Sequence, residues 1–193
     1  VTPLLQSSAT KLFSPQHKGR LFTIFRDPIE RVVSLFYYLQ KADWEPTFNP
    51  ALRNMTLEQY AYSSLLESNF VTRLLLDKME APLEERDFDR LKAILRTKCL
   101  VGLLGDGLLE ESVKRFDRYF GFSPVKSECK PGYLKQGTNR LSHPKVPAPD
   151  SSAYKEMARK NHMDLRLYEY VKHLFAEQAS LVEDIGTLAD SKQ

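Results

Sequence analysis

Two short apolar runs along the chain predict buried β-strands. The first covers residues 21–25 and reads Leu-Phe-Thr-Ile-Phe, and the second covers residues 99–104 and reads Cys-Leu-Val-Gly-Leu-Leu. Runs of this length, in which apolar residues fall on both faces of the strand, are typical of parallel strands that are covered by helices. We therefore expect both runs in the interior of one parallel sheet.

Helical spacing of apolar residues predicts the elements around these strands. Asp27 is a good N-cap and Pro28 a good first helical residue, so a helix is expected over residues 28–41. Its apolar residues recur at helical spacing and form one core face: Ile29, Val32, Val33 and Phe36. Further helical segments are expected over residues 57–65, 69–76 (as helix or turn), 88–96 and 109–120, and in one last long helix after residue 152.

The order of strand, helices, strand and helices places the chain in the α/β class with a parallel sheet. The chain length suits one domain over residues 1–193. Residues 1–20 are expected to be an irregular lead-in with a helical turn near 8–13, and residues 185–193 a frayed tail. Residues 123–152 form a long segment rich in proline, and loops of that length are usually functional or disordered.

Charge and cysteine content exclude several classes of function. The 28 basic and 25 acidic residues give a net charge of +3, which is too small and too evenly spread for a nucleic-acid binder. No apolar run approaches the ~20 residues that cross a bilayer, so we expect no membrane contact from this segment, although a signal or anchor upstream of Val1 stays open. Cys99 and Cys129 cannot form a zinc site alone, and whether they pair is left open.

The turn after the first strand holds the most informative residues of the chain. Arg26 stands at the carboxyl end of the strand, where parallel α/β folds bind ligands, and its planar guanidinium suits a phosphate. Ser34 lies seven residues beyond Asp27, nearly two helical turns, so one anion beside the first turns could contact both Arg26 and Ser34. The alternative is that Arg26 pairs with Glu30 and that Ser34 is a solvated helix residue.

Residues 26–38 read Arg-Asp-Pro-Ile-Glu-Arg-Val-Val-Ser-Leu-Phe-Tyr-Tyr. This segment resembles the 3′-phosphate-binding motif of sulfotransferases that use 3′-phosphoadenosine 5′-phosphosulfate (PAPS). Its Asp-Pro-x-Glu-Arg form is more similar to the Golgi carbohydrate sulfotransferases than to the cytosolic enzymes. Weaker landmarks that also resemble that family lie at residues 69–73, 100–102, 110–112 and 161–170.

The resemblance implies a three-layer α/β fold of the P-loop nucleotide-binding type, with a parallel sheet that lacks its first strand and phosphate loop. Nothing before Leu21 has the glycine, lysine and hydroxyl pattern of such a loop. The implied reaction transfers a sulfonyl group from PAPS to a hydroxyl, with a carbohydrate as acceptor, no nucleic-acid partner and no metal. The implied compartment is the Golgi lumen, and this segment alone is expected to be inactive.

The resemblance also implies which residues bind the nucleotide. Arg26 and Ser34 would bind the 3′-phosphate. In the long loop, Lys135, Thr138 and Arg140 are the candidates for a segment that covers the nucleotide, although a solvated basic loop is the alternative. The catalytic base stays unknown.

Two other functions are alternatives to the sulfotransferase. One is a noncatalytic nucleotide-binding or protein-interaction domain derived from the same fold. The other is a kinase of the related P-loop fold, which is disfavoured because the chain shows no Walker-type lysine.

Overall fold

Two parallel strands form the sheet of the described chain. The structure is a computed structural model that describes residues 5–11, 21–105, 107–121 and 146–181. Strand β1 (Leu21–Arg26) pairs with β2 (Cys99–Leu104), with Leu21 opposite Cys99 and Arg26 opposite Leu104. Both predicted strands are confirmed, and the mixture of helices with a parallel sheet places the protein in the α/β class.

Most of the predicted helices are also present, with changes at their ends. The helix after β1 and the helix before Gly121 agree with the prediction, and Gly121 ends the latter in the left-handed conformation with φ of 67°. The last long helix is instead two helices, which meet at the buried Asn161. The helical elements are α1 (Leu5–Lys11), α2 (Pro28–Leu39), η1 (Pro50–Asn54), α3 (Leu57–Tyr62), α4 (Phe70–Leu76), α5 (Glu85–Lys98), α6 (Leu108–Phe120), α8 (Ser152–Lys160) and α9 (His162–Glu177).

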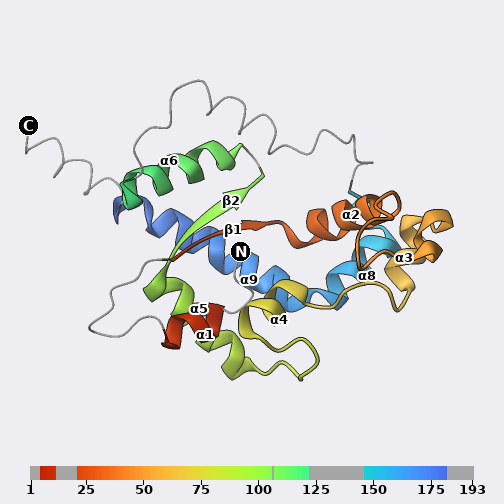
Figure 1. Cartoon of the computed structure of the whole chain (residues 1–193), viewed down its shortest axis with the longest axis horizontal. Coiled ribbons are helices and arrows are strands. Elements are labelled where there is room, and N and C mark those ends of the chain that lie inside the picture. The colour runs from red at the N-terminus through yellow and green to blue at the C-terminus, as the bar shows by residue number, and fades with distance from the viewer. Residues whose placement is uncertain (1–4, 12–20, 106, 122–145, 182–193) are drawn as a thin grey trace, which may run out of the picture.

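Helices pack on both faces of β2 (Figure 1). On one face, Val101 and Leu103 are buried in the larger apolar cluster with residues of α5 and α9. On the other face, α6 approaches so closely that a Cβ atom added to Gly102 would lie 2.7 Å from the Phe116 ring and 2.9 Å from the Cβ of Ser112. Gly102 therefore permits the close packing of α6 against the strand.

Side chains close the outer edge of β2. Gln178 accepts a hydrogen bond from the Val101 amide at 2.9 Å and donates one to the Cys99 carbonyl at 2.8 Å. The Ser112 hydroxyl accepts from the Leu103 amide at 2.8 Å and lies 3.1 Å from its carbonyl oxygen. Because these backbone groups already have partners, another strand cannot pair at this edge without displacing both side chains.

Strand β1 is less buried than its apolar sequence predicts. Phe22 is 52% exposed and Ile24 is 40% exposed, so the expectation that helices cover both faces of this strand is wrong. The reason is that α6 packs mainly over β2, while Phe22 of β1 contacts it through Phe116, with ring centroids 4.9 Å apart. Within the described residues, β2 is also the sole strand paired with β1.

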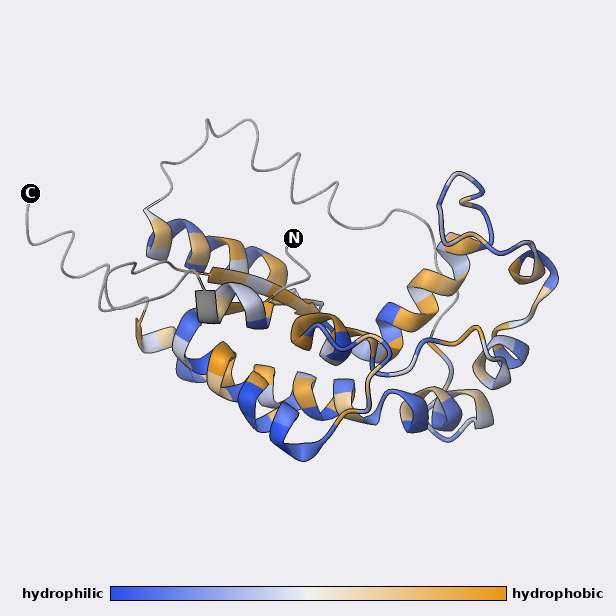
Figure 2. Ribbon diagram, turned by 60° about the horizontal axis from the view of Figure 1, so that its bottom comes forward, coloured by the Kyte–Doolittle hydropathy of each residue, from blue (hydrophilic) through white to orange (hydrophobic). Residues whose placement is uncertain are grey.

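A second apolar cluster forms beside the sheet from α2, η1, α3 and α8. The predicted core face of α2 is buried in it, and Phe36 stacks on Tyr60 of α3 with ring centroids 4.8 Å apart. Figure 2 shows that the helices carry both apolar and hydrophilic residues. The flank of α2 opposite its core face, which includes Arg31, Ser34 and Leu35, is only partly buried. No helix among the described residues combines the length and the apolar character that crossing a bilayer requires.

Candidate functional site

The turn between β1 and α2 places a strand end directly against a helix start. The Asp27 carboxylate caps the helix, because one of its oxygens accepts hydrogen bonds from the amides of Ile29 at 2.9 Å and Glu30 at 3.0 Å. Pro28 takes the first helical position, where its missing N–H leaves no bond unmade. This turn fixes Arg26 at the carboxyl end of the strand, beside the first turns of α2.

Arg26 and one flank of α2 line an open hollow with a volume of about 330 Å³, here called the arginine hollow. The residues from α2 follow one another at helical spacing, so they share one side of the helix. The structure therefore brings Arg26 and Ser34 to the same hollow, on the side of α2 that faces away from its core residues. The lining residues are Arg26, Arg31, Ser34, Leu35 and Tyr38.

Arg26 is also held by its neighbour Glu30. Its Nε lies 3.2 Å from a carboxylate oxygen of Glu30, and the two side chains are 30% and 40% exposed. The ion pair between Arg26 and Glu30, which was the alternative to anion binding by Arg26, is thus present. Such partly exposed pairs contribute only ~0–1 kcal/mol, so an anion can compete with Glu30 for the guanidinium. Within the described residues, the two terminal nitrogens of Arg26 have no protein partner.

Arg31 is a second cation at the arginine hollow, and it was not among the phosphate-binding residues that the sequence predicted. Its Nη1 donates to Glu67 at 2.9 Å, and its guanidinium lies 4.9 Å from the centroid of the Phe70 ring. Its Nε and Nη2 are buried without a hydrogen-bond partner in the described structure. The signal that could have revealed it is the spacing of three residues between Arg31 and Ser34, which places both on one flank of a helix.

Charges around the arginine hollow are nearly balanced. The guanidinium groups of Arg26 and Arg31 face the carboxylates of Glu30 and Glu67, one acid for each base. Both acids lie beside the arginines rather than on the described lining of the hollow. A phosphate that enters the hollow could replace Glu30 on Arg26, where a planar guanidinium can donate two parallel hydrogen bonds.

Tyr38 is the aromatic residue in the lining of the arginine hollow. Its hydroxyl donates a hydrogen bond to the Glu45 carboxylate, which raises the pKa of Tyr38 above its ordinary value because the bond favours the protonated phenol. Its ring meets the edge of Trp44 with centroids 6.5 Å apart. Tyr38 therefore stays a neutral wall at physiological pH and adds no charge to the hollow.

Several predicted residues lie outside the described part of the chain. These are the loop candidates Lys135, Thr138 and Arg140, together with Cys129. Cys99 is buried in the core, and burial raises the pKa of its thiol to about 12. Within the described residues, no group of three or more histidine, cysteine or acidic side chains is arranged to hold a metal ion.

Comparison of the chain with protein-family models, curated proteins and solved structures found no match.

Proposed function

We propose that this chain is the nucleotide-binding part of a PAPS-dependent sulfotransferase and that the arginine hollow receives the 3′-phosphate of the donor. The observation that supports the proposal is the convergence of Arg26 and Ser34 on one hollow at the carboxyl end of a parallel strand. This is the end of the sheet at which α/β folds bind ligands. The resemblance of residues 26–38 to the 3′-phosphate motif supports the same assignment.

In the proposed reaction, the oxygen of an acceptor hydroxyl forms a bond to sulfur while the bond between sulfur and the 5′-phosphate oxygen breaks. The products are a sulfate ester and adenosine 3′,5′-bisphosphate, and the hydroxyl proton passes to a base that is not assigned. Arg26 and Ser34 would act by binding and orienting the donor rather than by touching the reacting atoms. Cationic side chains can stabilise the charge that develops on the leaving phosphate.

The finer fold proposal is a three-layer α/β fold of the P-loop nucleotide-binding type. The side chains of Gln178 and Ser112 close the outer edge of β2, so a larger sheet would have to grow at β1. The exposed apolar side chains of Phe22 and Ile24 give β1 a surface that a neighbouring element could cover. We propose that the first strand and the phosphate loop of the complete fold pair at this edge.

The remaining assignments belong to the same proposal. Lys135, Thr138 and Arg140 would cover the bound nucleotide, the acceptor would be a carbohydrate, and the compartment would be the Golgi lumen. Each follows from the family resemblance of the sequence.

Calorimetric titration with two nucleotides tests the proposal. Adenosine 3′,5′-bisphosphate should bind more tightly than adenosine 5′-phosphate by about 10- to 150-fold, because charge-assisted hydrogen bonds to the 3′-phosphate contribute ~1.5–3 kcal/mol. Equal affinity for the two nucleotides would show that the chain does not recognise a 3′-phosphate, and the proposed function would then be wrong.

A further inference from the structure

The end of η1 carries an acceptor pattern for N-linked glycosylation. Residues 54–56 read Asn-Met-Thr, and no other asparagine of the 193 residues is followed by a residue other than proline and then by serine or threonine. Such a pattern accepts an oligosaccharide on its asparagine when the chain enters the lumen of the secretory pathway. Because three residues also match by chance, the inference depends on where the structure places Asn54.

The last three residues of η1 point in different directions. A 3₁₀-helix has three residues per turn, so neighbouring side chains lie about 120° apart. Leu52 is buried in the cluster with α2 and α3, whereas Arg53 pairs with Asp43 at 2.8 Å and lies over the ring of Phe48. Asn54 is exposed, and within the described residues its side chain makes no hydrogen bond or ion pair. Its amide group is therefore available at the surface.

The backbone on both sides of Asn54 is held against α2. The side chain of Gln40 donates to the carbonyls of Leu52 at 2.9 Å and Met55 at 3.0 Å. The Met55 amide also donates to the Leu52 carbonyl at 3.2 Å. An oligosaccharide on Asn54 can thus extend into solvent without displacing a packed side chain.

Thr56, the third residue of the pattern, has a second role as the N-cap of α3. Its hydroxyl oxygen accepts from the Gln59 amide at 3.2 Å, and the Gln59 side chain accepts from the Thr56 amide at 2.8 Å. Aspartate is an equally good N-cap but lacks the hydroxyl of the acceptor pattern, whereas serine provides both. Substitutions of Thr56 can therefore separate glycosylation from the stability of α3.

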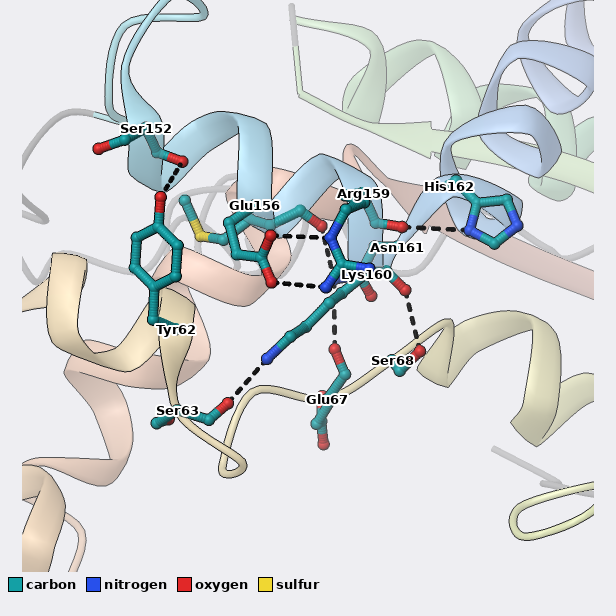
Figure 3. A network of polar contacts seen from close by, with 11 residues as sticks. Tyr62, Ser63, Glu67, Ser68, Ser152, Glu156, Arg159, Lys160, Asn161 and His162 are labelled. Carbon is teal, nitrogen blue, oxygen red and sulfur yellow. Dashed lines mark hydrogen bonds and ion pairs between the residues drawn. The ribbon is translucent and has the colours of Figure 1, made fainter.

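The end of α3 is anchored on α8 (Figure 3). Tyr62 donates to the Ser152 carbonyl at 3.4 Å, and Lys160 donates to the Ser63 carbonyl at 2.8 Å. Both contacts involve the last residues of the helix or its C-cap, whereas Asn54 precedes the first. A glycan on Asn54 is therefore compatible with these contacts.

We propose that Asn54 carries an N-linked oligosaccharide. In the transfer, the Asn54 amide nitrogen bonds to the anomeric carbon of an oligosaccharide, and the bond from that carbon to a polyprenyl diphosphate breaks. The amide gives up one proton, and a luminal oligosaccharide transferase catalyses the step. The inference rests on the luminal compartment of the proposed function. It does not involve the arginine hollow, whose described lining contains no residue of η1.

Mass spectrometry of two samples from cultured animal cells tests the proposal. One is the complete protein expressed from its own coding sequence, and the other is the 193-residue chain secreted behind a cleavable signal peptide. Each should carry one oligosaccharide, which peptide N-glycosidase removes while converting the asparagine to an aspartate. Peptide mapping should place this conversion at Asn54.

Three variants locate the modification. Asn54→Gln and Thr56→Asp should each lose the oligosaccharide completely, because one lacks the acceptor amide and the other lacks the hydroxyl. Thr56→Ser is the matched control and should keep it. After enzymatic removal of the glycan from the parent, Thr56→Asp should unfold at the same temperature as the parent, since the N-cap of α3 is retained.

The outcomes separate this inference from the proposed donor site. A folded complete protein without the glycan, or a glycan that persists in Thr56→Asp, would overturn the inference. Adenosine 3′,5′-bisphosphate is titrated into the glycosylated and the deglycosylated parent, and both should bind it equally. If the nucleotide fails to bind while Asn54 carries the glycan, the donor site is wrong and the modification stands. If the nucleotide binds and Asn54 is bare, the reverse holds.

Discussion

Asn69 and Asp164 cap each other's helices: Asn69 caps the start of α9, and Asp164 caps the start of α4. The side-chain oxygen of Asn69 accepts from the amides of Met163 at 2.8 Å and Asp164 at 3.3 Å, at the start of α9. The two carboxylate oxygens of Asp164 accept from the amides of Val71 at 3.0 Å and Thr72 at 2.8 Å, at the start of α4. Two segments that are more than 90 residues apart in the sequence are thereby joined in the interior.

This reciprocal capping predicts a large loss of stability for Asp164→Ala. The substitution leaves the Val71 and Thr72 amides without an acceptor, and each buried unsatisfied group costs ~1–3 kcal/mol. The free energy of unfolding in urea should fall by about 2–4 kcal/mol. Asp89→Ala is the control, because this exposed aspartate forms a surface ion pair with Lys92 on α5, and its effect should stay within about 0.5 kcal/mol. Similar losses for both variants would contradict the role given to Asp164.

The two hydrogen bonds of the Gln178 side chain at the edge of β2 lead to a second prediction about stability. Gln178→Ala removes the partners of the buried Val101 amide and the Cys99 carbonyl. We expect the free energy of unfolding to fall by about 2–4 kcal/mol. The neighbouring Glu177→Ala changes only a surface pair with Arg96, so chemical denaturation should show a change of less than about 1 kcal/mol. An unchanged Gln178→Ala protein would mean that this edge is not closed by Gln178.

Tyr60 predicts how stability depends on alkaline pH. Burial raises the pKa of Tyr60 to about 12, from an ordinary value of 10.0. Between pH 10 and 12, the Tyr60 hydroxyl therefore stays protonated in the folded state but ionises in the unfolded state. The stability that Tyr60 contributes is complete below pH 10 and is lost as the pH rises from 10 to 12. The decline should amount to about 2–3 kcal/mol.

Urea denaturation of the parent and of Tyr60→Phe, at pH 9 and pH 11, measures this contribution. The variant should lose less stability than the parent between the two pH values. Some alkaline loss should remain, since burial also raises the pKa of Cys99 to about 12. Identical pH dependence of the parent and the variant would show that Tyr60 titrates normally in the folded protein.

Local signals in the sequence predicted the elements that form the candidate site. The Asp27 cap, Pro28 at the helix start and the apolar spacing of α2 all act within one or two turns, so they can be recognised without tertiary structure. The same spacing predicted that Ser34 lies on the side of the helix where one anion could contact both it and Arg26, and both residues line the arginine hollow.

Features that depend on distant contacts could not be predicted in this way. The break between α8 and α9 is stabilised by Asn161, which accepts from the Asn69 amide at 3.1 Å, a partner 92 residues away. The exposure of Phe22 depends on where α6 packs. The apolar sequence of β1 gives no information about the position of α6. Likewise, the pairing of Arg31 with Glu67 requires knowing how the segment over residues 63–68 folds back on α2.

Calorimetric titration of Arg26→Ala and Glu30→Gln with adenosine 3′,5′-bisphosphate and adenosine 5′-phosphate shows whether Arg26 binds the 3′-phosphate. Arg26→Ala should weaken binding of the bisphosphate by about 10- to 150-fold, because it removes a charge-assisted hydrogen bond to the 3′-phosphate. Glu30→Gln should strengthen it by up to about 5-fold, since the competing carboxylate is gone. Both variants should bind adenosine 5′-phosphate almost as the parent does. Equal losses of affinity for the two nucleotides in the folded Arg26→Ala protein would contradict the assignment of Arg26 to the 3′-phosphate.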